Sequence, residues 1–465
     1  LIQGLTKGFL TPSMFHGFKP CKRGGKLPAF MAGFFRNVFE DNGWLKETPC
    51  IHSIRAIRQV TRLFKKVELP CSAARIKRAY ERYVSNDQGI SSSVDSRNDV
   101  WNTVRTIASY LWADLEGLSG ALYCAPGVFG SGATAERLAF NERHTIRRWP
   151  RRGNESFPAS FHTSHTESGS ELYDGLDLLD EHEEQPVRVV QVPKTLKTPR
   201  TISVEPSYMM LRQQSIAKPL MDILEEGYLG FKSIRFTDQS VNRELARIGS
   251  IDGSLSTIDL SDASDLVSLD SVKMIFGSCP SFLQLLLDSR SSRAQLPDSS
   301  VIELRKFASM GSALCFPIEA MVFFTIAIAS MIHQSGRSPS KYSLEQLSKK
   351  IAVYGDDIIV PTETADGVME WLEAFGLRVN RDKSFTTGFF RESCGGDYYL
   401  GQDVTPAYVR QWANSIDTRN PRFVAACVSL SNQFYMKGLW YASQYIRDTV
   451  EAKLGRFART TQPVG

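Results

Sequence analysis

Residues 351–360 read IAVYGDDIIV, with a β-branched run on each side of Gly355-Asp356-Asp357. Such runs favour strands, and Gly and Asp favour the turn between them, so the segment predicts a β-hairpin. The turn would carry two adjacent carboxylates. Because burying an unpaired carboxylate is costly, this pair should face a cation or solvent. Taken alone, however, the segment is more typical of a plain hairpin turn than of a metal site.

A second acidic strand end lies well before this hairpin. Residues 255–265 read LSTIDLSDASD, and the apolar run Leu255–Asp259 is predicted to be a short strand. If this strand neighbours the hairpin, Asp259 meets Asp356 and Asp357. Three carboxylates from two strands can hold two Mg²⁺ ions about 4 Å apart. One ion would lower the pKa of an attacking 3′-hydroxyl, and the other would stabilise a leaving pyrophosphate.

Helix capping is the alternative role for the acids of this segment. A helix is predicted over Asp265–Phe276, and Asp262 is well placed to cap it. The same role is open to Asp259 taken singly. Its combination with the hairpin acids is the stronger signal.

Two further segments are suited to a phosphate ligand. Residues 309–319 read SMGSALCFPIE, a loop with Ser309 and Gly311 that leads into a long apolar helix, where the backbone can approach a ligand closely. By itself this is more simply a Gly-containing helix start. Upstream, Lys194, Lys197 and Arg200 recur every three residues between two predicted strands, an arrangement suited to gripping a triphosphate. A solvated charged loop explains them about equally well.

A lysine follows the hairpin in the segment NRDKSF, residues 380–385. Lys383 is thereby placed where it could protonate pyrophosphate, although the chemistry alone gives a weak signal.

Composition indicates a folded chain with an anionic partner. Of its 465 residues, 42% are hydrophobic and 23% charged, and the formal net charge is +5. Basic residues cluster in segments 55–66, 75–82 and 143–152, which favours a polyanion. Taken singly, such runs are usually solvated helix faces. The length allows two or three subdomains.

Neither a disulfide framework nor a membrane span is expected. The eight cysteines are scattered and form no C-x-x-C pair, which disfavours a zinc knuckle and favours a reducing cytoplasm. The longest apolar stretch, Ala320–Ile332, is too short for a bilayer and is predicted to be a buried helix. The first residues show no secretory signal.

The order of predicted elements indicates an α+β fold with an antiparallel sheet and helices on one face. Further strands are expected at 187–192, 201–204, 377–380 and 398–400, and further helices at 209–226, 369–375 and from about residue 406 onward.

In linear order, the basic loop, strand acid, S-M-G loop, Y-G-D-D hairpin and N-x-x-K-S-F segment resemble motifs F, A, B, C and D of positive-strand RNA virus polymerases. The segments DLSDASD, SMGSALCFPIE and YGDDIIVP are particularly similar to levivirus replicases, those of single-stranded RNA bacteriophages, and to narnavirus-like polymerases. The similarity covers residues 187–401. It implies a right-hand polymerase with fingers in 1–250, including a motif F-like loop at 187–206. A palm would occupy 251–402, with a fingers insertion at 277–308, and a thumb 403–465.

The resemblance also implies roles for the candidate residues. The metal ligands, for two Mg²⁺ ions that Mn²⁺ can replace, would be Asp259, Asp356 and Asp357. The residues contacting the nucleotide or template would be Lys194, Lys197, Arg200, Asp265, Ser309 and Gly311. Asp265 would read the ribose 2′-hydroxyl, but it lies six residues after Asp259, where many animal-virus polymerases use five. Ser312 stands where many relatives carry Asn.

The activity implied is primer-independent, RNA-templated RNA synthesis from ribonucleoside triphosphates in the host bacterial cytoplasm. Levivirus replicases use host elongation factors Tu and Ts and in some cases a ribosomal protein, whereas narnavirus polymerases act alone. No membrane partner is implied.

Two other functions stay open. A reverse transcriptase also uses an acidic palm hairpin, although Gly355 and the S-M-G segment argue against it. A non-catalytic RNA-binding scaffold with a palm fold should lack one of the three acids, and all three are present.

Overall fold

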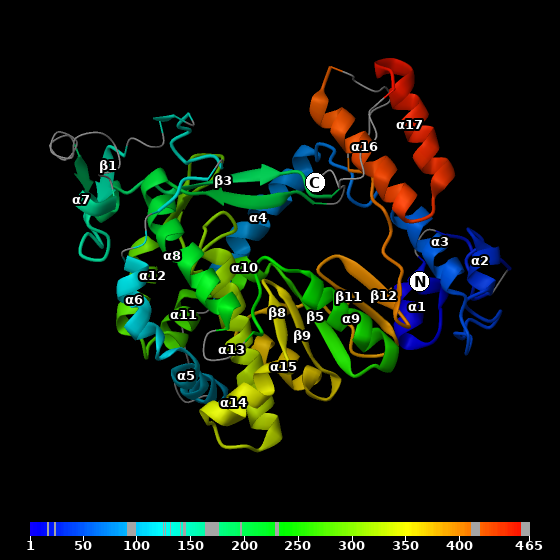
Figure 1. Ribbon diagram of the computed structural model, residues 1–465, viewed down its shortest axis with the longest axis horizontal. Coiled ribbons are helices and arrows are strands. Elements are labelled where there is room, and N and C mark those ends of the chain that lie inside the picture. Colours follow the sequence, from blue (N-terminus) through cyan, green and yellow to red (C-terminus); the bar gives the residue numbers. More distant parts are fainter. Residues whose placement is uncertain are drawn as a thin grey trace. The chain divides into compact units, whose positions relative to one another are not determined.

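The computed structural model in Figure 1 describes residues 1–456 except 16–17, 23–24, 91–98, 124, 126, 131, 140, 143–145, 163–175, 196–197, 228–231 and 411–418. The chain divides into two units. Unit 1 comprises Leu1–Ala79, Gln191–Arg200 and Asp397–Gly465. Unit 2 comprises Tyr80–Val190 and Thr201–Gly396. Which parts form fingers, palm and thumb remains a prediction.

Unit 1 joins the two ends of the chain. Its elements are α1 (Ile2–Lys7), η1 (Pro12–Met14), α2 (Ala32–Arg36), α3 (Ile51–Arg62), β13 (Gln402–Asp403), α16 (Pro421–Met436), α17 (Trp440–Leu454) and most of β12 (Gly396–Tyr399). On α3, the buried Arg58 forms an ion pair with Asp397 and donates to the Val404 carbonyl at 2.9 Å. Gln59 donates to the Ala407 carbonyl at 3.0 Å. These contacts hold α3 against residues 397–407.

Unit 2 holds most of the strands and helices of the chain, while α4 (Ala73–Gln88) is divided between the units. Its strands are β1 (Arg148–Pro150), β2 (Asp177–Leu179), β5 (Leu255–Ser261), β6 (Arg293–Gln295), β7 (Val301–Glu303), β8 (Ala352–Tyr354), β9 (Asp357–Pro361), β10 (Arg378–Val379), β11 (Phe390–Ser393) and most of β3 (Val187–Val192) and β4 (Arg200–Val204). Its helices are α5 (Asp99–Trp112), α6 (Leu115–Tyr123), α7 (Ala159–His162), η3 (Glu181–Glu183), α8 (Ser207–Glu226), α9 (Ser240–Asp252), α10 (Ala263–Leu266), α11 (Leu269–Ile275), α12 (Pro280–Ser289), α13 (Cys315–Ser335), α14 (Lys341–Ser348) and α15 (Thr362–Ala374).

The central sheet has the strand order β10-β5-β9-β8, and each neighbouring pair is antiparallel. Ile258, Ile358 and Val360 are buried in it, as their β-branched runs predicted. Helix α15 packs on β5, β9 and β10, and α9 packs on β5, β8 and β9 (Figure 1). The predicted α+β class and the hairpin of β8 and β9 are therefore confirmed.

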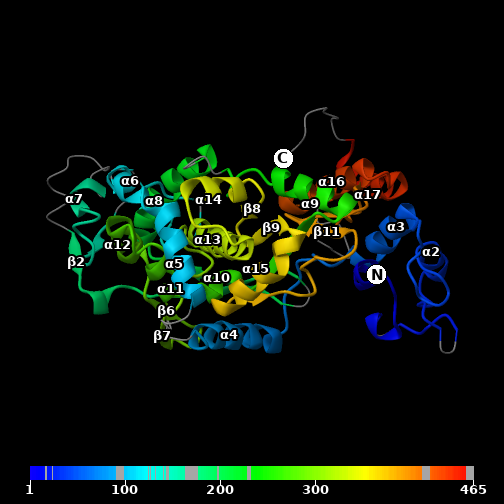
Figure 2. The ribbon, with the colours of Figure 1, turned by 90° about the horizontal axis from the view of Figure 1, so that it is seen from below.

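Helix α13 is the core helix of unit 2. It contacts α5, α8, α10, α11, α14 and α15, and Figure 2 shows it among them. It is long and apolar enough to cross a membrane, but 94% of its most apolar window is buried inside the protein. Burial of this side-chain surface is the main stabilising term for a helix of this kind. The predicted buried helix is confirmed.

The prediction of a single helix over Asp265–Phe276 is wrong. The chain forms α10 and α11, separated by Val267 and Ser268 in extended conformation. The Phe307 amide donates to the Val267 carbonyl at 2.9 Å, so this short stretch pairs with a remote segment. Ser268 then caps α11, its Oγ accepting from the Ser271 amide at 3.0 Å.

Asp262 does not cap a helix. Its φ is 55°, and its side chain makes no capping hydrogen bond. Instead its Oδ2 accepts from Arg82 at 2.6 Å, from Arg378 at 3.0 Å and from Asn86 at 3.1 Å. The carboxylate thus ties the turn after β5 to α4 and β10.

Other elements differ in length only. Helix α15 begins at Thr362 instead of Met369, and β10 covers two of the four residues expected at 377–380. Of the third basic segment, residues 143–145 lie outside the described part of the chain.

Candidate active site

The two acidic strand ends lie next to each other in the central sheet, as predicted. Asp259 on β5 is the antiparallel partner of Asp357, the first residue of β9. Asp356 precedes it in the turn from β8. Asn242 on α9 donates to the Asp357 carbonyl at 3.2 Å, which fixes the start of β9. Backbone pairing therefore brings the candidate metal ligands together.

These carboxylates repel one another. The pKa of Asp357 is raised to about 7, first by burial and then by Asp356 and Asp259. Burial also raises the pKa of Asp259, although Lys383 opposes this shift. A divalent cation would relieve the repulsion, and carboxylate oxygens are the ligands that Mg²⁺ prefers. Among the described residues, no three His, Cys, Asp or Glu side chains already form a metal cluster, so metal ligation stays a prediction.

Lys383 compensates part of this charge. Its Nζ lies 3.2 Å from Asp259 Oδ1 and 3.3 Å from Oδ2. Asn380 donates to Asp259 Oδ2 at 2.7 Å, and Ser384 Oγ accepts from the Asp259 amide at 3.1 Å. Burial lowers the pKa of Lys383, but Asp259, Glu392 and Asp356 together raise it by more, so the lysine stays charged. The segment NRDKSF thus lies beside the strand acid.

The turn of the hairpin requires a glycine. Gly355 has φ 58°, and a Cβ there would lie 2.1 Å from Cε2 of Phe316. The Phe316 ring, on the first turn of α13, also packs against Tyr354 with 5.5 Å between ring centroids. The acidic turn is therefore held tightly against the core helix.

We expect Gly355→Ala to destabilise the protein by about 2–4 kcal/mol, because left-handed backbone strain adds to the clash with Phe316. Gly253→Ala is the matched control, since Gly253 has φ 73° but open space around a Cβ. It should cost only about 1 kcal/mol. Urea unfolding of both variants measures the difference, and equal losses would contradict the contribution of Phe316.

The S-M-G loop is held by backbone contacts. Gly311 has φ 127°, and a Cβ there would lie 2.0 Å from the Ser203 carbonyl oxygen. The Ser203 amide donates to the Met310 carbonyl at 2.8 Å. Ser309 Oγ lies 3.0 Å from the hydroxyl of Tyr83, which is also 3.0 Å from Ser203 Oγ. The backbone at Gly311 thus approaches β4 closely, whereas the expected close approach to a ligand stays a prediction.

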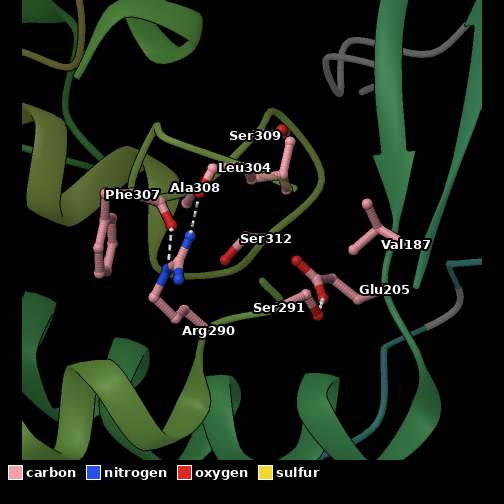
Figure 3. Close-up of a pocket in the computed structure, with 9 residues that line it drawn as sticks. All are labelled: Val187, Glu205, Arg290, Ser291, Leu304, Phe307, Ala308, Ser309 and Ser312. Carbon is pink, nitrogen blue, oxygen red and sulfur yellow. Dashed lines mark hydrogen bonds between the residues drawn. The ribbon is translucent and has the colours of Figure 1, made fainter. Parts of the chain in front are cut away.

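A small cavity lies behind this loop, with about 10 Å³ of space, enough for about one water molecule. Figure 3 shows Ser309 and Ser312 on one side and Glu205 with Ser291 on the other. Ser291 Oγ donates to Glu205 Oε2 at 2.6 Å. Burial raises the pKa of Glu205 to about 7. The carboxyl therefore binds a proton more tightly in the folded protein.

This shift predicts a pH dependence of stability. Between its ordinary pKa and about 7, Glu205 binds more protons folded than unfolded, so its contribution falls as pH rises through that range, by up to about 3 kcal/mol. Glu205→Gln should remove this loss. The measured quantity is the free energy of unfolding of the variant minus that of wild type, obtained from urea unfolding. This difference should be higher at pH 8 than at pH 5.

The control for this measurement is Glu303→Gln, at an exposed position on β7. Its stability relative to wild type should not change with pH. A Glu205→Gln variant that behaves in the same way would show that Glu205 ionises normally.

Asp265 has a partner that no sequence motif indicated. Lys306, with its side chain fully buried, donates to Asp265 Oδ1 at 2.8 Å. The sequence analysis also assigned no role in the site to Asn380 or Glu319. Glu319 on α13 is buried, and its pKa is raised well above the usual range, first by burial and then by Asp356 and Asp265. Both residues stand inside quoted motifs, which is the signal that could have identified them.

The basic loop is described in part. Lys194 and Arg200 belong to unit 1; Lys194 follows β3, Arg200 is the first residue of β4, and Lys197 lies outside the described residues. Both predicted strands are present. The proposed contact of these side chains with a triphosphate remains a prediction.

Comparison with known proteins identifies the family. A sequence model for the family "RNA replicase, beta-chain" matches residues 176–421, which include the paired acids, the S-M-G loop and Lys383. The chain belongs to this family. The resemblance to levivirus replicases is thereby confirmed.

Individual relatives are RNA phage proteins. The chain is 38% identical over 257 residues to the RNA-directed RNA polymerase subunit beta of Enterobacteria phage SP, covering 54% of this chain and 40% of that protein. It is 38% identical over 223 residues to the subunit of Escherichia virus Qbeta, covering 48% and 35%. The chain thus spans well under half the length of these relatives. The RNA-dependent RNA polymerase of bacteriophage phi12 is a structural neighbour with TM-score 0.46 and 12% identity, covering 87% of this chain and 72% of that one.

Proposed function

We propose that this replicase chain is the catalytic part of an RNA-dependent RNA polymerase that copies a positive-strand RNA phage genome. The observation that carries the proposal is the direct pairing of Asp259 with Asp357, next to Asp356, in an antiparallel sheet. The match to the replicase family over the same residues supports it. Template-directed addition of nucleotides needs this combination of clustered acids and neighbouring cations.

The donor set suits two divalent cations, Mg²⁺ or in its place Mn²⁺. Asp259, Asp356 and Asp357 would hold them, because the three carboxylates offer oxygen ligands and excess negative charge, and Asp356 contributes to the raised pKa of both Asp259 and Asp357. When bound, the ions supply activation of the 3′-hydroxyl and stabilisation of the pyrophosphate.

The chain's own side chains orient the nucleotide in this proposal. Lys383, charged and in contact with Asp259, is placed to give a proton to the leaving pyrophosphate. Ser309 and Gly311 would support the template and nucleotide, and Asp265 the ribose. Lys194, Lys197 and Arg200 would bind the triphosphate.

The partners and setting are proposed from the family. RNA template, RNA product and ribonucleoside triphosphates are the substrates, and synthesis would start without a primer near the template 3′ end. Host elongation factors Tu and Ts and a ribosomal protein are candidate subunits, and the host bacterial cytoplasm is the compartment. Identification of proteins that copurify with the chain from its native host tests this set, and recovery of the chain alone would contradict it.

Asp356→Asn should abolish RNA synthesis, because it removes a metal-binding charge, while RNA binding stays within about 2-fold of wild type. The measurements are incorporation of labelled ribonucleotides and a filter-binding titration with template RNA. Asp366→Asn, an exposed position on α15, is the control and should leave both unchanged. Synthesis that survives Asp356→Asn would refute the metal assignment.

The same assay addresses the two rival functions. Preferential use of deoxyribonucleotides on an RNA template would favour a reverse transcriptase. RNA binding without synthesis by the wild-type chain, purified with its host partners, would favour a scaffold.

A further inference from the structure

The observation behind the inference is a lysine with no exposed surface. The side chain of Lys306 is 0% exposed, and its Nζ donates to Asp265 Oδ1 at 2.8 Å. The same Nζ lies 3.5 Å from the ring centroid of Tyr83. A buried ammonium is costly unless it is paired, and here a carboxylate and an aromatic face pair it. Burial lowers the pKa of Lys306, but Asp265, Tyr83 and Asp87 together raise it by more, so it stays charged.

Lys306 is also fixed through its backbone. Its amide donates to Asp87 Oδ1 at 3.1 Å, and it forms an isolated bridge with Ser268. The neighbouring Phe307 amide donates to the Val267 carbonyl. Residues 306–307 are therefore hydrogen-bonded to residues 267–268, which directly follow α10. This backbone pairing places Lys306 beside Asp265.

One carboxylate oxygen of Asp265 is left to accept a further hydrogen bond. Asp265 is 19% exposed at its side chain, and within the described residues its Oδ2 has no hydrogen-bond partner. Asp265 lies on α10, which packs on α13, and Phe316 on the first turn of α13 packs against Tyr354, two residues before Asp356. An oriented hydrogen-bond acceptor thus lies on a helix that packs against the same core helix as the acidic turn.

Tyr83 connects this pair to the S-M-G loop. Its ring lies against Lys306, and its hydroxyl is 3.0 Å from Ser309 Oγ and 3.0 Å from Ser203 Oγ. Tyr83 is 2% exposed, so none of these contacts competes with solvent. One tyrosine on α4 thereby supports both the ribose acid and the loop proposed to hold the nucleotide.

We propose that Lys306, supported by Tyr83, is the positioning residue that makes Asp265 selective for ribonucleotides. It holds Oδ1 so that Oδ2 accepts a hydrogen bond from the 2′-hydroxyl of the incoming nucleotide. The inference rests on the proposed polymerase function. Lys306 itself does not touch the nucleotide, so its effect should appear only for substrates that carry a 2′-hydroxyl.

The test compares kcat/KM for a ribonucleotide and for the matching 2′-deoxyribonucleotide, using the chain purified with its host partners. Lys306→Met should lower the ribonucleotide value by about 10-fold to 100-fold, the effect of losing a hydrogen bond to a charged acceptor. The deoxyribonucleotide value should stay within about 2-fold, so the selectivity ratio falls. Equal losses for both substrates, or an unchanged ratio, would overturn the inference.

Arg305→Met is the matched control. Arg305 is exposed, and its guanidinium donates to the carbonyls of Gln88 and Ile90, not to Asp265. This variant should keep the wild-type ratio. If it loses selectivity as Lys306→Met does, the effect belongs to the segment and not to the ion pair.

A second variant covers the case in which Lys306→Met fails to fold. Lys306→Met combined with Asp265→Asn leaves no uncompensated charge, and it should show the same ratio as Asp265→Asn alone, because the lysine acts through that acid. A further fall in the ratio would show that Lys306 acts independently. Absence of any synthesis by the wild-type protein would instead contradict the polymerase function itself.

Discussion

The pairing of Asp259 with Asp357 is the constraint on which the site depends. Backbone hydrogen bonds between β5 and β9 fix the two residues opposite each other, so their carboxylates cannot separate to relieve repulsion without loss of strand pairing. Burial first, and then this repulsion from Asp356 and Asp259, raises the pKa of Asp357. Lys383 offsets part of it at Asp259, which leaves a site whose remaining negative charge favours a cation.

Helix α13 gives this charged site a rigid support. The S-M-G loop leads directly into α13, and Phe316 on its first turn packs against the hairpin at Gly355. Because α13 is buried on nearly all sides, neither the loop nor the turn can shift without disturbing the core. The two glycines, at 311 and 355, are needed because the backbone approaches Ser203 and Phe316 more closely than a Cβ permits.

The sequence was informative where structure is determined locally. Strands β5, β8 and β9 and the turn between the last two follow from β-branched runs and turn residues, and the order of motifs identified Lys383. The break at Val267 could not be predicted, because its cause is pairing with Phe307, which lies far along the chain. Asp262 was misassigned for the same reason: its partners Arg82 and Arg378 come from remote elements. A capping preference is a local rule, and two remote guanidinium groups override it.

Lys306 marks the limit of prediction from sequence most clearly. A lysine between Arg305 and Phe307 is normally expected at the surface, because burying its ammonium costs several kcal/mol unless a partner is present. That partner, Asp265, is 41 residues away, and the second, Tyr83, comes from another helix. Once the lysine is buried, however, the carboxylate it holds cannot turn away without leaving a buried charge unpaired. Because burying a lysine is costly, the burial of Lys306 could not be expected from the sequence. The same cost fixes the orientation of Asp265.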